Sequence, residues 1–326
     1  MLVALALKEE LAKLEAAGRL RAEVQLLTCA NPLGLAQAVL GNAQGRFELA
    51  SGNNYNRGFP FLAGPIATAV EGQLGSDATT NLRLIRSAWH DALQALPETT
   101  ALAALQKRLM LLAHDADVVL DLHCSKEATM HLYTSDGLWG VVEPLARYIG
   151  ARATLLALDS GAQSFDEALS YTWVQLQQKF GERFPVPNGS VAVTVEHRGQ
   201  RDVSYPLAGQ DAGAILHYLT QQGDIDGTAP PLPELQAPAT PLAGSEQFTA
   251  PVSGVLVHMV EVGARVQAGD VLFHIVDPIS GARTEIASQT TGVVYMRKDA
   301  RFVRLGDPLG RVSGSKIIRS GKLLGA

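Results

Sequence analysis

The stretch VVLDLHCSKEATMHLYT, residues 118–134, decides the fold class. Its apolar run 118–120 ends in Asp121-Leu122-His123, which is typical of a buried strand that carries an imidazole at its end. In α/β sheets, ligands gather at the carboxyl ends of the strands. We therefore consider His123 a candidate metal ligand, with Asp121 placed to orient an imidazole or metal-bound solvent.

Other side chains of the same stretch offer alternatives to this interpretation. A single histidine after a strand is most often an ordinary polar residue. His131 is a second candidate ligand, but its His-Leu-Tyr-Thr setting predicts an alternating strand that points elsewhere. Cys124 is expected to pack rather than to coordinate a metal. His123 is thus the preferred ligand of the stretch.

Helical patterns and short apolar runs alternate on both sides of this stretch. Strands that alternate with helices indicate an α/β layered fold with a largely parallel sheet. Residues 41–65 are rich in Gly, Asn and Pro and predict a long loop, and loops of that length are usually functional. We predict helices over 1–17, 76–95, 98–114, 138–149 and 165–180, and strands over 23–27, 117–122 and 190–196.

Length and composition favour a soluble globular protein of two domains. The chain has 326 residues, of which 47% are hydrophobic and 18% charged. A net charge of -5 argues against nucleic acid and anionic membranes as partners. No apolar run reaches the roughly 18 residues that a membrane span needs. The two cysteines lack C-x-x-C spacing, so we expect a cytoplasmic protein without a disulfide framework.

The last third of the chain changes character and contains a repeat. Residues 221–246 are dense in Pro, Ala and Gly and predict a linker or an extended crossing segment between a first domain, 1–220, and a second, 247–326. In the second, SGVLVHMVEVGARVQAGDVLFHIV is similar to TGVVYMRKDARFVRLGDPLGRVS, with the glycines at 254 and 292 and the Gly-Asp pairs at 269 and 306 in matching places. Two similar β units predict a small sandwich with duplicated halves.

This repeat resembles the barrel-sandwich of biotinyl and lipoyl carrier domains. Those domains present a modifiable lysine on an exposed hairpin, whereas the hairpin here reads Val276-Asp277-Pro278. We therefore expect no prosthetic group. The resemblance leaves packing, oligomer contact or shaping of an active-site entrance as its role.

A second candidate site is the polar loop GRFELASGNNYNRGFP, residues 45–60. Arg46 and Arg57 are its only cations, with Asn54 and Asn56 beside them. Guanidinium groups bind carboxylates through two hydrogen bonds, and amides can orient them, so the loop suits an acidic or amino-acid substrate. The alternative is a solvated loop in which Asn and Gly adopt turn conformations.

A third candidate is the strand in SVAVTVEHRGQRD, residues 190–202. Alternating valines lead to Glu196 at its end. A carboxylate at that point is a plausible general base and then acid near a metal-bound water. The signal is weak by itself, because strands often finish in Glu.

Together the three fragments resemble one family. Asn-x-x-Asn-Arg-x-Phe-Pro at 53–60, Asp-Leu-His at 121–123 and Glu196 are similar to the succinylglutamate desuccinylase/aspartoacylase family, relatives of the zinc carboxypeptidases. The resemblance covers about residues 1–220, and the C-terminal β domain is similar to the one found in many members. It implies a mixed sheet flanked by helices, followed by the small β domain.

The resemblance also implies an activity and roles for individual residues. It implies a zinc-dependent amidohydrolase that removes the acyl group from an N-acyl amino acid or similar amide. His123 matches the later zinc histidine, and Glu196 matches the residue that activates the zinc-bound water. Asn56 and Arg57 match the pair that binds the substrate carboxylate, while Arg46 matches, less closely, the arginine that polarises the scissile carbonyl.

One part of the family pattern is missing. Two zinc ligands come from an H-x-x-E motif between an early strand and the first long helix, and here that helix begins at Met1. We expect the chain to lack this motif, to have lost it through truncation or a misplaced start codon, and to be inactive as it stands. Catalytic zinc usually has three protein ligands, so His123 alone would not hold it tightly.

Other function classes remain open at this point. The chain could be a metal-free binding or regulatory protein that keeps the Arg/Asn pocket. A biotin- or lipoyl-type carrier is disfavoured by the absent lysine. Small N-acyl amino acid-like molecules are the expected ligands, and a homo-oligomer is possible. Trp173 and Tyr171 are expected to belong to the core rather than to a pocket.

Overall fold

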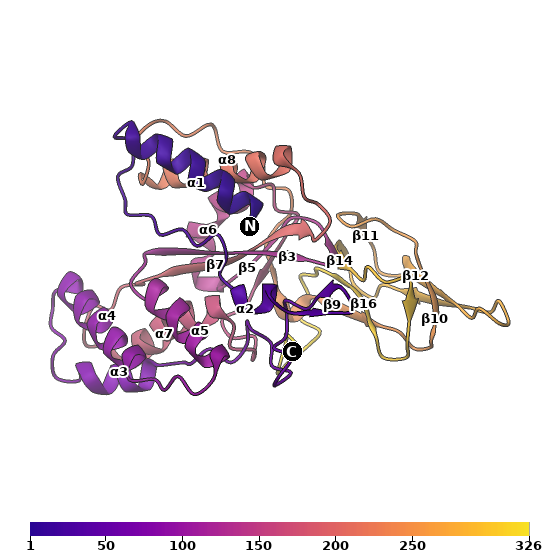
Figure 1. Cartoon of the computed structure of the whole chain (residues 1–326), viewed down its shortest axis with the longest axis horizontal. Coiled ribbons are helices and arrows are strands. Elements are labelled where there is room, and N and C mark those ends of the chain that lie inside the picture. Colours follow the sequence, from indigo (N-terminus) through magenta and orange to yellow (C-terminus); the bar gives the residue numbers. More distant parts are fainter. Residues whose placement is uncertain (326) are drawn as a thin grey trace. The chain divides into compact units, whose positions relative to one another are not determined.

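The structure is a computed structural model that describes residues 1–325, and it divides into two units (Figure 1). A sheet-rich unit comprises Met1–Leu26, Leu122–Ala157 and Thr194–Gly321. A helix-rich unit comprises Leu27–Asp121, Leu158–Val193 and the residues from Lys322 on. The predicted division of the sequence near residues 220 and 246 stays a prediction.

The main sheet has five strands in the order β3-β7-β5-β6-β8. β5 (His131–Thr134) pairs in parallel with β6 (Ala153–Leu156) and antiparallel with β7 (Val191–Gly199), while β6 pairs in parallel with β8 (Thr240–Pro241). β3 (Val118–Ser125) is next to β7 at the end of the order. The sheet is therefore mixed, which confirms the α/β fold class implied by the resemblance, whereas the expectation of a largely parallel sheet is wrong at β7.

In the sheet-rich unit, α1 (Leu2–Ala16) lies along α8 (Tyr205–Gln222), as Figure 1 shows. α1 buries Leu7 and Leu11. α8 begins at Ser204, whose hydroxyl accepts a hydrogen bond from the Leu207 amide, and ends at Gly223 in the left-handed conformation. α6 (Trp139–Tyr148) follows the short 3-10 turn Asp136–Leu138. The predicted helices over 1–17 and 138–149 are confirmed.

The predicted strand over residues 23–27 is wrong. This segment has no regular structure, and most of it is exposed. Its neighbour Leu20 makes only an isolated antiparallel bridge with Ile225. An apolar pattern becomes a strand only where another strand offers backbone partners, and no described residue does so here.

The helix-rich unit packs its helices around two tryptophans. The rings of Trp89 and Trp173 meet edge to face with centroids 5.9 Å apart, and both side chains are fully buried. Trp173 is therefore a core residue, as expected, and Tyr171 contacts the ring of Phe61. The helices are α2 (Pro32–Leu35), α3 (Ala63–Val70), α4 (Ala78–Gln94), α5 (Ala101–Ala113) and α7 (Phe165–Phe180), with a small hairpin of β1 (Ala38–Val39) and β2 (Asn42–Ala43).

The C-terminal strands form two antiparallel sheets around a core that includes Phe248 and Phe273. One sheet has the order β13-β12-β10-β15 and the other β11-β14-β16-β9, with β4 (Glu127–Ala128) paired to β14. The strands are β9 (Glu246–Thr249), β10 (Gly254–His258), β11 (Arg265–Val266), β12 (Val271–Val276), β13 (Arg283–Ala287), β14 (Gly292–Arg297), β15 (Phe302–Val303) and β16 (Pro308–Val312). A 3-10 turn, Leu242–Gly244, precedes them.

The sequence repeat has a structural counterpart in these sheets. β10 and β12 come from the first copy and pair in one sheet, while β14 and β16 come from the second copy and pair in the other. The short strand of each copy crosses over, since β11 pairs with β14 and β15 with β10. A Cβ at Gly254 or Gly292 would collide with a backbone carbonyl of the neighbouring strand, which explains both glycines.

No helix in the described part of the chain is long and apolar enough to cross a membrane.

Candidate functional site

β7 carries Glu196 in a half-buried position on the sheet-rich unit, and the strand continues beyond it to Gly199, so the prediction that the strand ends at Glu196 is wrong. Glu196 is directly opposite His131 on β5, so the two side chains share one face of the sheet. Nδ1 of His131 donates to the Thr129 carbonyl at 2.8 Å, which leaves Nε2 as an acceptor in the neutral ring. Among the described residues, neither this Nε2 nor Glu196 Oε2 has a hydrogen-bond partner, although both atoms are buried. Buried acceptors without a partner are typical of a site that binds solvent or a ligand.

Asp211 on α8 holds the two residues that follow Glu196. Its carboxylate accepts a hydrogen bond from His197 Nδ1 at 2.9 Å and two from the Arg198 guanidinium at 2.8 and 2.9 Å. Burial raises the pKa of Asp211, but the hydrogen bonds and charges of His197 and Arg198 outweigh it and hold that pKa below the usual range. Arg198 has a φ of 62°, which non-glycine residues rarely adopt. The carboxylate thus fixes the backbone just beyond the predicted general base.

β3 carries His123 in a half-buried position in the sheet-rich unit, and Asp121, two residues earlier, belongs to the helix-rich unit. Cys124 is exposed and free, so it is not a core residue at that point. Although Cys124 is exposed, partial desolvation of its thiol and, next, the nearby charge of Glu196 raise the pKa of that thiol. His131 is in the buried strand that the alternation predicted and is fully enclosed. The ligand role of His123 and the supporting role of Asp121 stay predictions.

The predicted substrate loop belongs entirely to the helix-rich unit. Asn54 is buried, and its side chain accepts a hydrogen bond from the Asn56 amide at 2.9 Å, which is the turn role that Asn residues often have. The Asn56 side chain accepts from the amide of Phe165, the first residue of α7, at 2.9 Å. Arg57 Nη1 donates to the Asn56 carbonyl at 2.6 Å. The Arg46 guanidinium lies 5.5 Å from the centre of the Phe47 ring.

A cleft of about 330 Å³ opens beside this loop within the same unit. Asn54 and Arg57 line it together with Leu102 and Gln106 of α5 and with Lys322. Gln106 donates to the Arg57 carbonyl at 2.8 Å and so fixes the backbone of that arginine. The residues that line this cleft include two cations and no carboxylate, which favours an anionic ligand.

Sequence reasoning did not find Gln106 or Lys322. Gln106 is in the middle of an ordinary helical pattern, and Lys322 is more than two hundred residues from the loop. No local signal marks either residue, because only tertiary packing brings them to the cleft.

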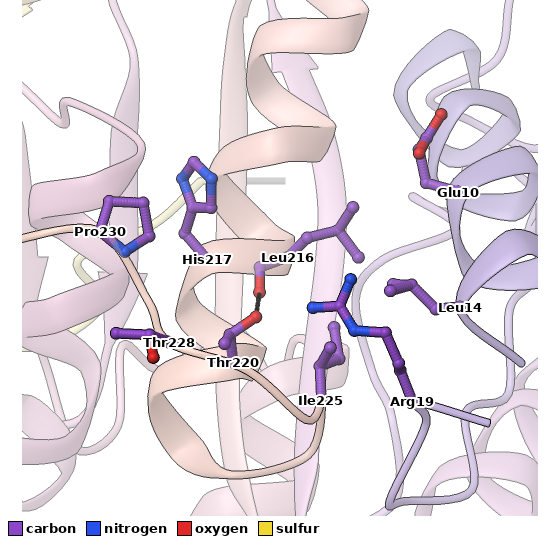
Figure 2. Close-up of a pocket in the computed structure, with 9 residues that line it drawn as sticks. All are labelled: Glu10, Leu14, Arg19, Leu216, His217, Thr220, Ile225, Thr228 and Pro230. Carbon is purple, nitrogen blue, oxygen red and sulfur yellow. Dashed lines mark hydrogen bonds between the residues drawn. The ribbon is translucent and has the colours of Figure 1, made fainter. Parts of the chain in front are cut away.

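A second cleft, of about 270 Å³, occurs in the sheet-rich unit between α1 and the end of α8 (Figure 2). Its charged lining includes Glu10 and Arg19, and His217 lies on the opposite side of the cleft from Glu10. Arg19 already donates through Nε and Nη2 to the Asp226 carbonyl. None of the predicted site residues lines this cleft.

The predicted site residues therefore fall into two groups. Arg46, Asn54, Asn56 and Arg57 share one loop of the helix-rich unit, to which Asp121 also belongs, and His123 and Glu196 belong to the sheet-rich unit. In residues 1–325, no group of three or more His, Cys, Asp or Glu side chains is arranged to hold a metal ion. The residues present therefore do not fit the usual three-ligand zinc site.

The H-x-x-E spacing does occur once, at His258-Met259-Val260-Glu261, so the expectation that the chain lacks this pattern is wrong. It begins at His258, the last residue of β10, and so lies in the C-terminal β sheets and not before the first long helix, where the family has it. Arg297 pairs with Glu261 at 3.0 Å. Burial, and then the charges of Arg297 and Arg301, lower the pKa of His258 to about 4. Arginines at this distance disfavour a bound cation, so the pair does not replace the missing ligands.

Solved structures with similar folds give this site a family context. A protein assigned to the succinylglutamate desuccinylase/aspartoacylase family from Shewanella amazonensis SB2B matches with a TM-score of 0.83 and 26% identity, over 94% of this chain and 86% of that one. In structure, the chain matches this family over most of its length. A second family protein, from Shewanella frigidimarina NCIMB 400, matches with a TM-score of 0.76 and 26% identity, over 87% of this chain and 78% of that one.

A more distant member supports the fold alone. The succinylglutamate desuccinylase/aspartoacylase from Rhodobacter sphaeroides has 16% identity and a TM-score of 0.54, over 83% of this chain and 70% of that one. No family model matches the sequence, and no curated protein matches it. These structural matches confirm the resemblance noted in the sequence. The succinylglutamate desuccinylase/aspartoacylase family consists of metal-dependent amide hydrolases.

Proposed function

We propose that the chain binds an N-acyl amino acid, or a similar small amide that bears a carboxylate, as a member of the succinylglutamate desuccinylase/aspartoacylase family. The observation that carries the proposal is the 26% identical structural match over 94% of the chain. The Asn-x-x-Asn-Arg loop adds a second argument, since it lines an anion-favouring cleft. Two arginines imply a carboxylate on the ligand but do not distinguish one acyl group or amino acid from another.

Individual roles follow from the chemistry of each side chain. Arg57 offers the planar donor fork that a carboxylate fits. The Asn56 side chain accepts a hydrogen bond from the first amide of α7, which fixes the loop next to Arg57. Arg46 is proposed to polarise the scissile carbonyl. Glu196, with one buried oxygen that has no partner among the described residues, would take the proton of the attacking water and pass it to the leaving amine.

We further propose that this 326-residue chain, as it stands, does not hydrolyse its ligand. Family members are expected to use zinc, which activates water and stabilises the developing oxyanion. His123 is the one family ligand that the sequence supplies, with Asp121 as its support. The described side chains do not complete a zinc site.

Zinc content and hydrolysis, measured together, test this proposal. The chain and a version extended by the residues encoded upstream in frame would be compared for zinc per chain and for hydrolysis of a panel of N-acyl amino acids. Zinc and activity in the extended form alone are expected, and Glu196→Gln in that form should remove activity while zinc stays bound. Zinc binding and hydrolysis by the chain itself would refute the proposal.

Ligand binding provides a test that does not depend on zinc. Calorimetric titration with N-succinyl-L-glutamate and N-acetyl-L-aspartate should show binding that Arg57→Lys weakens about 10-fold, because lysine keeps the charge but loses the donor fork. Binding without zinc or activity in either form would favour the alternative, a metal-free binding or regulatory protein. An intact mass without an adduct would exclude a carrier role.

Two further proposals concern the setting of the protein. A cytoplasmic location is supported by two cysteines that are both free. Association into a homo-oligomer is tested by light scattering of the purified chain.

A further inference from the structure

The residues Lys322–Gly325, called the tail segment here, lie against the predicted carboxylate-binding loop within the helix-rich unit. Arg57 Nε donates to the Gly325 carbonyl at 3.0 Å. The Leu323 amide donates to the Ser160 carbonyl at 2.8 Å, and the Leu323 side chain is only 9% exposed. Lys322 lines the cleft beside Arg57. The tail segment is therefore held at both of its ends and anchored by one buried side chain.

The surface that receives the tail segment is preorganised. Glu167 accepts hydrogen bonds from the amides of Ser160 and Ser164, at 2.8 and 3.2 Å, and so fixes the loop before α7. A Cβ on Gly161, which has a φ of 74°, would lie 3.2 Å from the Lys322 Cα. Glycine at this place permits the close approach of the two backbones.

The donors of Arg57 decide what the tail segment does. A guanidinium binds a carboxylate through two parallel hydrogen bonds, either from Nη1 and Nη2 or from Nε and Nη2. Nη1 already donates to the Asn56 carbonyl, so a ligand that keeps this hydrogen bond intact must use the second arrangement. The Gly325 carbonyl accepts from Nε, so it takes one of the two donors that this arrangement needs.

We propose that the tail segment competes with the carboxylate of the ligand for Arg57 and must leave before the ligand binds with both hydrogen bonds. This rests on the proposed function of Arg57, and it adds a regulated state of that site. A hydrogen bond to a charged group typically changes an equilibrium by a factor of 10 or more. Removing the tail segment should therefore tighten ligand binding on the order of 10-fold.

Calorimetry on three variants tests the competition. N-succinyl-L-glutamate and N-acetyl-L-aspartate would be titrated into the full chain, into a variant that lacks residues 322–326, and into Leu323→Asp, which places a charge at the buried anchor. Both variants should bind more tightly. Ile317→Asp is the matched control, because Ile317 is 68% exposed, and it should bind as the full chain does. Equal or weaker binding in both variants overturns the proposal.

A second measurement separates this proposal from the proposed function. A labelled peptide with the sequence SGKLLG, residues 320–325, would be added to the variant that lacks residues 322–326, and its anisotropy followed. Binding that Arg57→Ala removes supports docking at Arg57, and absence of binding overturns it. If the peptide binds and no N-acyl amino acid binds any variant, the proposed function fails and the competition fails with it, while docking stands.

Discussion

Replacing Asp211 by Asn should destabilise the protein far more than the same change in a surface ion pair. The Asp211 side chain is 3% exposed and accepts three hydrogen bonds, from His197 and from Arg198, which is 20% exposed. Breaking a buried pair typically costs 3–5 kcal/mol, because the remaining charge stays buried without a partner. Arg198 retains some access to water, and Asn retains one acceptor oxygen, so we expect a loss of about 3 kcal/mol.

The assay is urea unfolding followed by circular dichroism, with Asp226→Asn as the matched control. Asp226 pairs with Arg21 at 2.7 Å, but both side chains are 58% exposed. Exposed pairs contribute roughly 0–1 kcal/mol, so the control should hardly move the midpoint. Equal losses in the two variants would refute the argument that burial sets the strength of the Asp211 contacts.

The pH dependence of the same difference provides an independent check. The pKa of Asp211 is lowered from its ordinary value of 3.8, so the folded state binds its proton less readily than the unfolded state. The stabilisation by Asp211 is therefore complete above that ordinary value and is lost as the pH falls below it through the folded pKa. The gap between the parent chain and Asp211→Asn should stay constant from pH 7 to 5 and narrow below pH 4, whereas widening on acidification would contradict the sign.

Three more predictions address packing and titration. Gly189→Ala should destabilise by about 3 kcal/mol in urea, because the new Cβ would overlap the buried Trp173 ring, whereas Gly209→Ala in α8, with no neighbour within 4 Å, should be neutral or slightly stabilising. The imidazole of His258 should titrate in NMR with a pKa of about 4, and a midpoint near 6.5 would contradict its burial beside two arginines. Cys124 is exposed, so it should react with a thiol reagent in the folded protein, and a thiol that reacts only after unfolding would show that Cys124 is buried.

Most helices could be predicted from the sequence, because the periodicity of a long helix is present in its own residues and does not depend on distant ones. The five predicted helices all occur, and the side chains of Asp77 and Thr100 cap the N-termini of α4 and α5, as such residues often do. The orientation of β7 was not predictable, since alternating valines produce a buried strand in either direction. The strand expected at 23–27 failed for a related reason, because local pattern does not reveal whether a partner strand exists.

The site could be predicted only where side chains of suitable chemistry are also neighbours in the sequence. Asn54, Asn56 and Arg57 are adjacent in sequence, so their common loop was expected, and the structure adds that each amide oxygen has a backbone donor. The tail segment and Gln106 reach Arg57 only through tertiary packing. The H-x-x-E at 258–261 shows the converse, since a spacing that matches a metal motif lies beside two arginines that disfavour a cation.

The donors of Arg57 connect the proposed function to its regulation. Within the helix-rich unit, two of its nitrogens already bind carbonyl oxygens, one from the preceding residue and one from the tail segment. A carbonyl oxygen carries only a partial charge, so a carboxylate that reaches Nε and Nη2 together forms the stronger contact. Exchange of the tail segment for a ligand therefore replaces the neutral acceptor at Nε by a charged one. The tail segment is tethered, so it is present at Arg57 at a high effective concentration. The ligand displaces it once the ligand concentration is high enough to outweigh that effective concentration.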